Sequence, residues 1–579
     1  MTDSEDIAEE QRTIGKVLPP NTDEVADAAP PVERRATPRT AAAAEADRSK
    51  GAAFLVASGI LLSRFAGLIR QTMMARYLGA GMAADAFNAA FRIPNLLQNL
   101  FGEGVLSASF IPEYAGLLGR RNEKEATALA GAVAGMLALV SSLLVLIGVL
   151  TAPWLVAIIA NGFTGEKREL TVLLTRILFP GAGVLVFSAW CLGILNSHRR
   201  FFMSYTAPVL WNLAMILTLV LFHGGRTESQ LAVYLAYGSV VGSALQFGVQ
   251  VPQVLKLARG IRPMLTTATE SVRNVFRNFT PAFIGRGVVQ ISAYVDAWLA
   301  SYLGNGAVSS FTYAQTIYVL PISLFGMAIS AAELPTMSRA TGTSAEISAY
   351  LRRRLAAGLD RIAFFIVPSV VAFFALGDLI VHLLLESGRF QRGNTIWVWQ
   401  ILIGSTIGLL ASTMGRLYSS TFYAMRDTKT PLRFAVVRVV LTTLLGYFFA
   451  LVLPGLVGLD RRLGAAGLTA SAGLAGWVEF LLLRRRLEER IGRTRFIPAR
   501  MARLWAAAIG AAAIPWIYKV AVDWGRPVFS THQDPISSKL IALVLLAVYG
   551  VTYIALTAAF RIPESSVVIN RARKLLRLG

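Results

Sequence analysis

Apolar stretches of about 20 residues recur along almost the whole chain, and each is long enough to cross the hydrocarbon core of a bilayer. Three of them occupy residues 130–150, 231–251 and 541–560. Only 16% of the 579 residues are charged, whereas a soluble protein of this length needs roughly a quarter to cover its surface. Backbone groups cannot stay unpaired in lipid, so these stretches are predicted to be helices. The expected fold class is an all-α polytopic membrane protein.

Fourteen transmembrane helices account best for the positions of the basic residues. The predicted spans are 52–78, 83–116, 127–160, 170–196, 205–223, 230–255, 278–303, 307–337, 355–386, 394–424, 432–454, 463–483, 501–521 and 537–560. With both termini in the cytoplasm, the inner loops carry about 30 Lys and Arg residues and the outer loops about 8. The reverse orientation, or a count of thirteen, would remove this asymmetry.

A weak internal repeat of about 225 residues predicts two related lobes. Residues 77–81 (YLGAG) recur as 302–306 (YLGNG), and chance matching of helix-end glycines is the alternative explanation. Six helices separate equivalent points, so the copies are parallel, which suits alternating access by rocking of two lobes. The predicted organisation is a disordered cytoplasmic tail (1–50), an N-lobe (51–260), a C-lobe (261–490) and two further helices with a basic cytoplasmic C-terminus (491–579).

The remaining composition excludes several classes of protein. The net charge of +22 is explained by basic loops on one membrane side, and no basic segment is interleaved with aromatic residues as a nucleic-acid module would require. One cysteine, Cys191, and four scattered histidines predict no disulfide and no metal site. No Walker-type phosphate loop is present, and short outer loops without a D-x-D motif argue against a membrane glycosyltransferase. The sequence favours a transporter over an enzyme.

Ionisable and amide side chains concentrate in the first two spans, where each charge costs about 2.5–3.5 kcal/mol unless it has a partner or a wet cavity. At about 100° per residue, Asp85, Arg92 and Glu103 share one helical face, and Asn95 and Asn99 lie within about 80° of it. The candidate substrate-binding residues are Arg64, Arg70, Asp85, Arg92, Asn95, Asn99 and Glu103. Paired arginines suit phosphate or pyrophosphate oxygens. The alternative is that the arginines only pair with the carboxylates and helix ends.

The second lobe has fewer charges inside its predicted spans. Asp296 is a candidate ligand for a coupling cation, and pairing with Arg286 is the equal alternative.

Several motifs resemble the MurJ/MviN family over about residues 52–560. They are SRFAGLIR at 63–70, ARYLGAG at 75–81, FRIPNLL at 91–97, FGEG at 101–104 and FYAMRDTKTP at 422–431. The resemblance implies fourteen helices of the multidrug/oligosaccharidyl-lipid/polysaccharide exporter superfamily in a bacterial inner membrane. It also implies flipping of lipid II, the undecaprenyl-pyrophosphate peptidoglycan precursor, with roles in cell-wall biogenesis and cell shape. Arg64 and Arg70 match two arginines important in that family, and Asp85 and Arg92 match its pattern.

The chain departs from the family pattern at two expected arginine positions, where it has Gln98 and Thr316. Some members bind sodium between spans seven and eleven; Asp296 fits the first position, but Thr442 and Gly446 occupy the others. The expected driver is therefore the membrane potential or an ion gradient, with no cofactor and with sodium not supported by the full motif.

The expected function is a lipid II flippase that works by alternating access. The alternatives are export of another polyprenyl-linked glycan or of a drug, and a transport-inactive scaffold of the same fold. The expected partners are lipid II, membrane lipids and cell-wall synthesis proteins, with the monomer as the functional unit.

Overall fold

The computed structural model describes residues 38–101, 103–266, 269–494, 498–525 and 535–575, with only the backbone described at 38–57, 280–293 and some other positions, Glu103 among them. The described chain is helical, apart from an isolated bridge between Ser387 and Phe390, which confirms the expected fold class. The first part contains α1 (Pro38–Leu78), α2 (Met82–Phe101), α3 (Glu103–Gly119), α4 (Glu123–Leu150), α5 (Ala152–Ile159), α6 (Gly165–Ser197), α7 (Phe201–Phe222) and α8 (Glu228–Leu257). The second part contains α9 (Glu270–Ser301), α10 (Ala307–Pro321), η1 (Ile322–Met327), α11 (Ala328–Ser338), α12 (Ser344–Leu385), α13 (Arg392–Ala424), α14 (Lys429–Tyr447), η2 (Phe448–Val452), α15 (Leu453–Val457), η3 (Arg461–Leu463) and α16 (Gly464–Ile491). Three helices complete the chain: α17 (Pro498–Gly525), α18 (Pro535–Ala559) and α19 (Pro563–Leu575).

Eleven helical segments in the described part are long and apolar enough to cross a membrane. The three other predicted spans lie in α1, in α2 with α3, and in α9. These contain the ionisable residues that the sequence places inside the membrane, such as Arg70, Arg92 and Asp296. The three most polar spans are therefore the ones expected to face the protein interior and not the lipid.

The first helix begins earlier than the sequence analysis predicts. The expected disordered tail covers 1–50, whereas α1 begins at Pro38, so that prediction is wrong for 38–50. Proline suits the first turn of a helix, and the alanine-rich segment 41–46 has strong helix propensity. The rest of that tail, 1–37, lies outside the described residues.

The predicted second span, 83–116, contains α2 and α3, and Gly102 between them lies outside the described residues. The alignment of Glu103 with Asp85 on one helical face stays a prediction, because the side chain of Glu103 lies outside the described residues. Three predicted spans are interrupted: 127–160 forms α4 and α5, 307–337 contains the π-helical segment η1 directly after Pro321, and 432–454 contains the π-helical segment η2 shortly before Pro454. Proline removes a backbone donor, which favours such a local change of helical hydrogen bonding.

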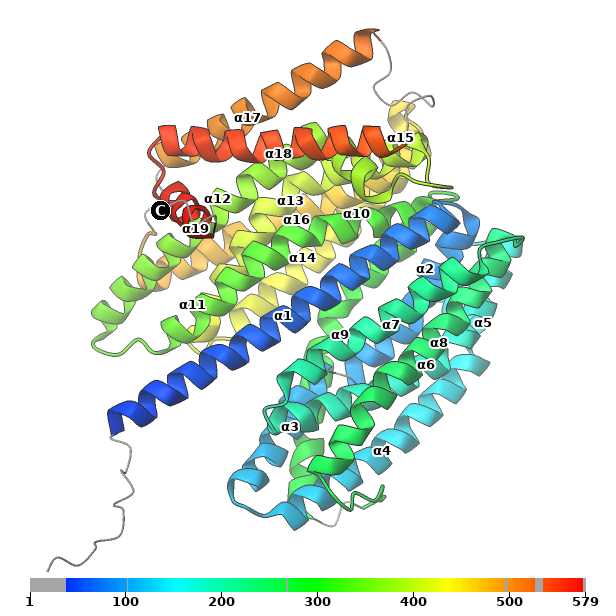
Figure 1. Cartoon of the computed structure of the whole chain (residues 1–579), viewed down its shortest axis with the longest axis vertical. Coiled ribbons are helices and arrows are strands. Elements are labelled where there is room, and N and C mark those ends of the chain that lie inside the picture. The colour runs from blue at the N-terminus through cyan, green and yellow to red at the C-terminus, as the bar shows by residue number, and fades with distance from the viewer. Residues whose placement is uncertain (1–37, 102, 267–268, 495–497, 526–534, 576–579) are drawn as a thin grey trace, which may run out of the picture. The chain divides into compact units, whose positions relative to one another are not determined.

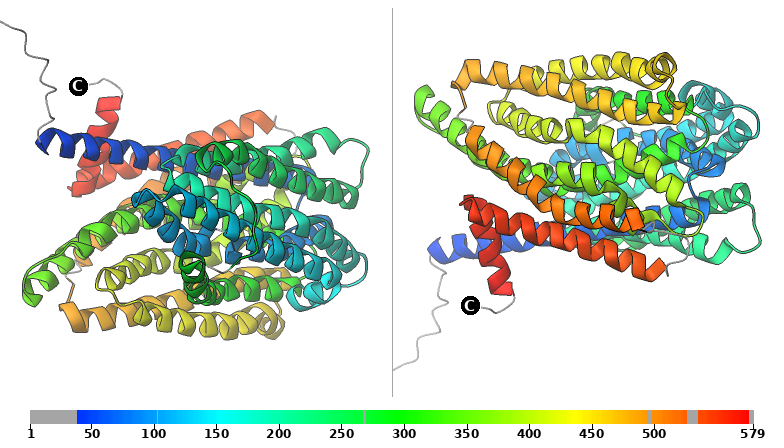
Figure 2. Two further views of the ribbon diagram at one scale, coloured as in Figure 1. Left: turned by 90° about the horizontal axis from the view of Figure 1, so that it is seen from below. Right: turned by 90° about the horizontal axis from the view of Figure 1, so that it is seen from above.

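Helices from the first and second parts of the chain form two packed groups within the unit Phe54–Gly579 (Figures 1 and 2). In the first group α6 packs against α2, α4 and α8, and α8 packs against α7. In the second group α13 packs against α12 and α16, and α14 packs against α16. The α13–α16 contact is close because Gly408 faces Gly473: a Cβ atom at Gly408 would lie 2.4 Å from the Cα atom of Gly473.

The last two long helices pack on the second group along α12, as Figure 1 shows. Tyr549 and Tyr553 of α18 donate hydrogen bonds of 2.7 and 2.6 Å to the carbonyl oxygens of Pro368 and Phe364. These carbonyls lie four residues apart on α12, so one face of α18 is held along about one helical turn.

Equivalent turns of the internal repeat meet at one end of the bundle, which we call the outer end after the orientation predicted from the sequence. Gly79 and Gly304 occupy the same position in the repeated motif, and both have positive φ angles, +63° and +94°. A Cβ atom on Gly306 would lie 2.4 Å from the carbonyl oxygen of Ala80, so the two turns are in direct contact. Glycine is needed at these positions for backbone conformation and for close approach.

Candidate functional site

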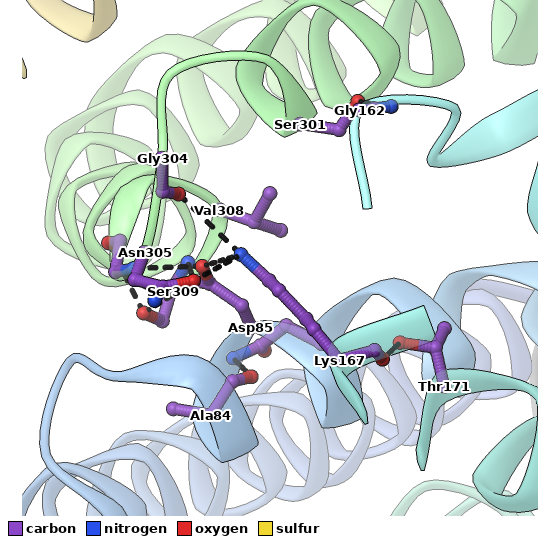
Figure 3. Close-up of polar contacts among 12 residues, drawn as sticks. Ala84, Asp85, Gly162, Lys167, Thr171, Ser301, Gly304, Asn305, Val308 and Ser309 are labelled. Carbon is purple, nitrogen blue, oxygen red and sulfur yellow. Dashed lines mark hydrogen bonds and ion pairs between the residues drawn. The ribbon is translucent and has the colours of Figure 1, made fainter. Parts of the chain in front are cut away.

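Asp85, the first acidic residue of α2, is fully buried at the outer end and is surrounded by donors (Figure 3). Lys167 of α6 lies 2.6 Å from its Oδ2 atom. The backbone N–H groups of Gly306 and Ser309 each donate to the carboxylate at 2.7 Å, and the Ser309 hydroxyl donates at 2.8 Å. A buried carboxylate is costly unless it is paired and hydrogen-bonded, and here both conditions are met. We call Asp85, Lys167, Gly306 and Ser309 the Asp85 cluster.

The Asp85 cluster joins the two groups of helices, because Asp85 and Lys167 belong to the first and Gly306 and Ser309 to the second. Lys167 Nζ also donates to the carbonyl oxygen of Gly304 at 3.4 Å and to Asn305 Oδ1 at 3.3 Å. The carboxylate lies at the N-terminus of α10, where unpaired N–H groups and the helix dipole favour negative charge.

Further hydrogen bonds between the groups surround this cluster at the outer end. The Tyr313 hydroxyl donates to the carbonyl oxygen of Gly79 at 2.9 Å, and the Arg389 N–H donates to that of Arg76 at 2.9 Å. The Gly162 N–H donates to the Ser301 hydroxyl at 3.1 Å. In this structure the outer ends of the two groups are therefore in contact.

A polar pocket of about 350 Å³, which we call the central pocket, lies between the two groups. Its walls come from α2, α9, α10, α13, α14 and α16. Arg92, Asn95 and Asn99 line it from α2, and Asp296 and Arg438 line it from α9 and α14. Arg92 is seven residues beyond Asp85 on the same helix, so its Cα atom lies about 10 Å further from the outer end.

The arginines of the central pocket have partial partners. Arg92 Nη2 donates to the Thr312 hydroxyl at 3.3 Å, and its Cζ atom lies 5.8 Å from the centre of the Phe311 ring. Arg438 Nη1 lies 3.2 Å from Glu479 Oε2, yet the Arg438 side chain is still 37% exposed. Both guanidinium groups can therefore reach a ligand in the pocket.

Asp296 has one carboxylate oxygen, Oδ1, that is buried without a hydrogen-bond partner in the described structure. Arg92 and Arg438 are its charged neighbours. The side chain of Arg286, the partner considered from the sequence, lies outside the described residues. An unpartnered acceptor between two arginines can accept a hydrogen bond from a donor on a bound ligand.

Arg70 and Arg64 lie on α1, away from the central-pocket lining. Arg70 is held by aromatic contacts: its Cζ atom lies 4.7 Å from the Trp211 ring centre and 5.9 Å from that of Phe91. The Arg64 side chain is exposed. Among the residues that the structure describes, neither arginine has a carboxylate within ion-pair distance. Structural pairing with Asp85 is therefore excluded, because Asp85 is occupied by Lys167 and α10.

The predicted site residues whose side chains are described lie in three places: the central pocket, the Asp85 cluster, and α1 with Arg64 and Arg70. Arg92, Asn95, Asn99 and Asp296 come together in the central pocket. For the three residues of α2 this agrees with the shared face predicted from helical spacing. Asp85 does not line that pocket, and its described contacts join α2 to α6 and α10; its predicted contact with substrate stays a prediction. Asp85 therefore meets the N-terminus of α10, whereas Arg92, further along α2, contacts Thr312 and Phe311 of α10 at the wall of the central pocket.

Two residues of the site were missed from the sequence. Lys167 stands among four consecutive charged residues, 166–169, at the start of a span, and nothing in that run singles it out. Arg438 lies inside the predicted span 432–454, and an intramembrane arginine is a signal that could have identified it. In the residues searched, no group of three or more potential metal ligands occurs.

Two groups of membrane helices that enclose a charged pocket and meet at one end form a fold shared with solved structures of membrane transporters. The structure titled "Lipid II flippase MurJ, inward closed conformation" matches with a TM-score of 0.71 at 21% identity, covering 88% of this chain and 98% of that one. An inward-facing multidrug resistance MATE family transporter matches with a TM-score of 0.58 at 19% identity, covering 76% and 98%.

Sequence comparison gives the family within that class. The family model described as "Lipid II flippase MurJ" matches residues 74–547. The lipid II flippase MurJ of Burkholderia cenocepacia is 34% identical over 442 residues, which cover 74% of this chain and 82% of the relative. The probable lipid II flippase MurJ of Rhizobium meliloti is 32% identical, with 89% and 94% covered. This chain belongs to the lipid II flippase MurJ family.

Proposed function

We propose that this protein moves lipid II from the inner to the outer leaflet of the bacterial cytoplasmic membrane. The observation that carries the proposal is the central pocket, in which two arginines from opposite helix groups face one polar space inside the membrane. Arginine offers a planar set of donors that suits the oxygens of a pyrophosphate. The asparagines beside Arg92 offer donors and acceptors for the sugars.

Arg438 supports lipid II as cargo although two arginines of the family pattern are missing. Gln98 and Thr316 are uncharged, but Arg438 enters the same pocket from α14. The charged residues that line the pocket are Arg92, Arg438 and Asp296, which gives a formal net charge of +1. We propose that Arg92 and Arg438 bind the pyrophosphate. Arg64 and Arg70 on α1 are proposed contacts on the path to the pocket, and Glu103 remains a proposed positioning residue.

The transport cycle is proposed to be alternating access. The Asp85 cluster holds the outer end together in the state described here, so the head group would enter from the inner side. Release to the outer leaflet then requires that the hydrogen bonds between Asp85 and α10 break. Asp85 thus acts by closing the outer end and does not contact the cargo.

The membrane potential is the proposed driver. Moving one elementary charge through the membrane changes the free energy by about 2.3 kcal/mol per 100 mV, so the two charges of a pyrophosphate gain roughly 4–5 kcal/mol per 100 mV on moving outward. Arg92 and Arg438 beside Asp296 repel a sodium ion and attract an anion. Asp296 as a ligand for a coupling cation is the rival proposal, and dependence of transport on external sodium would support it.

Both chain termini are proposed to lie in the cytoplasm, on the basis of the basic loops. We further propose that the monomer is the transporting unit, because both walls of the central pocket come from one chain. Contact with cell-wall synthesis proteins is proposed from the family alone.

The test is complementation in cells depleted of their own lipid II flippase, with labelling of lipid II at the outer surface. We expect the unchanged protein to restore labelling, and Arg92→Gln and Arg438→Gln to reduce it at least about tenfold, because each removes a charge-assisted bond to the cargo. Arg485→Gln is the matched control, since that side chain is 84% exposed and does not line the pocket.

Failure of the unchanged protein to restore labelling, despite normal insertion, would reject lipid II as cargo. Export of a drug or of another polyprenyl-linked glycan, or a scaffold role, would then be the remaining functions. Full activity of both pocket variants would reject the pyrophosphate site while leaving the cargo unchanged.

A further inference from the structure

A second arginine-lined pocket, separate from the central pocket, lies at the outer end. It has a volume of about 340 Å³ and is lined by Arg76 of α1, by Arg226 and Glu228 around the α7–α8 turn, and by Arg389 of the loop between α12 and α13. We call it the outer arginine pocket. None of its residues lines the central pocket.

The charges of this pocket do not cancel. Arg389 Nη1 lies 2.5 Å from Glu228 Oε1, which is the one carboxylate of the lining. Arg76 and Arg226 remain without a carboxylate among the described residues. His223 Nδ1 is within 2.8 Å of the Val220 carbonyl oxygen, so this ring is held by its own helix. With His223 neutral, the formal net charge of the lining is +2.

The Arg226 guanidinium is fixed before any ligand binds. Its Nη1 atom donates to the carbonyl oxygen of Phe222 at 3.0 Å, and its Cζ atom lies 4.5 Å from the Tyr234 ring centre and 5.2 Å from that of Phe222. The two rings stack on each other with centres 4.9 Å apart. A fixed guanidinium loses little conformational entropy when it binds an anion.

Apolar and aromatic surface next to the pocket points to a lipid as the occupant. Tyr234 is 38% exposed and the neighbouring Leu221 is 69% exposed. Exposed aromatic rings beside basic residues are typical of the level of the lipid headgroups. A free anion would use only the arginines, whereas a lipid also covers this apolar surface.

We propose that the outer arginine pocket binds the phosphate group of an anionic lipid in the outer leaflet of the cytoplasmic membrane. Because Arg76 and Arg226 belong to the first helix group and Arg389 to the second, a lipid phosphate bound there contacts both groups. Such a lipid stabilises the state in which the outer ends are together, and its affinity is higher for that state. The position at the outer surface rests on the orientation given under the proposed function.

Native mass spectrometry of the purified protein with phosphatidylglycerol tests this site. We expect Arg76→Gln and Arg226→Gln each to weaken binding of phosphatidylglycerol about tenfold or more, because each removes a charge-assisted bond to phosphate. Arg485→Gln, at the far end of α16, is the matched control and should bind like the unchanged protein. Phosphatidylcholine, which has no net charge, should bind weakly in every case.

Further measurements distinguish a lipid phosphate from free phosphate as the ligand, and distinguish this site from the proposed transport function. Binding of inorganic phosphate at this pocket, without binding of phosphatidylglycerol, would overturn the assignment of a lipid as the occupant. Equal phosphatidylglycerol binding by all variants would overturn the site itself. Arg92→Gln should lose transport and keep lipid binding, so failure of the proposed function and failure of this site give different results.

Discussion

Removal of the Ser309 hydroxyl should loosen the outer end of the protein and shift the transport cycle toward the state that is open there. Ser309 Oγ donates to Asp85 Oδ1 at 2.8 Å across the two helix groups. A hydrogen bond to a charged group contributes about 1.5–3 kcal/mol. This bond exists only when the outer ends are together. Ser309→Ala should therefore lower the ratio of molecules closed at the outer end to molecules open there by roughly 10- to 150-fold.

The neighbouring residue provides a matched control. Ser310 is also buried on α10, and its hydroxyl has no hydrogen-bond partner in the described structure. Ser310→Ala removes the same atoms in the same helix without touching Asp85, and should leave the ratio unchanged. Lys167→Met is the stronger perturbation, because it removes the positive partner of a buried carboxylate, a change that costs about 3–5 kcal/mol.

Distances between spin labels on the two helix groups would measure the ratio. Exposed positions at the outer end are Glu166, at the start of α6, and Arg461, in η3. Cys191 is the one cysteine and is buried, so a Cys191→Ala background leaves only the two introduced labels. We expect Ser309→Ala to populate a longer distance, with no such population in Ser310→Ala. Identical distance distributions for the two variants would refute the assignment of Asp85 to outer closure.

Two further predictions concern other parts of the structure. Gly408→Ala should destabilise the α13–α16 contact by about 1–3 kcal/mol, because its Cβ would lie 2.4 Å from the facing helix. Gly415→Ala is the control and should not destabilise the protein, because the space around Gly415 is open. Thermal unfolding in detergent compares the two variants, and equal melting temperatures would contradict the packing argument. Asp427 lies in the α13–α14 turn, and its pKa is lowered to about 2 by hydrogen bonds from Thr430 and by Arg490, which is 2.7 Å away. The ionised carboxylate therefore stabilises the folded protein above pH 3.8, and this stabilisation is lost as the pH falls toward 2. The melting-temperature difference between the unchanged protein and Asp427→Asn should thus be constant from pH 5 to 7 and shrink below about pH 4, and a constant difference down to pH 3 would disagree with the lowered pKa.

The sequence by itself determined the class of fold and the polar face of α2. Apolar stretches long enough to cross a bilayer must be helical, because backbone groups cannot stay unpaired in lipid, and eleven of the predicted spans qualify by length and composition. Helical periodicity placed Arg92, Asn95 and Asn99 on one face, and they do line one pocket. The position of Glu103 on that face stays a prediction, because its side chain lies outside the described residues.

Only the tertiary structure decided what each part of that polar face meets. Helical spacing fixes the direction of a side chain around its own axis, but it does not say which neighbour covers it. Asp85 and Arg92 share a face, yet Asp85 meets Lys167 and the N-terminus of α10, and Arg92 opens into the central pocket with Arg438. Lys167 lies 82 residues from Asp85 along the chain, and Ser309 lies 224 residues away. Contacts at such separations are set by how the two helix groups pack, which no local pattern contains.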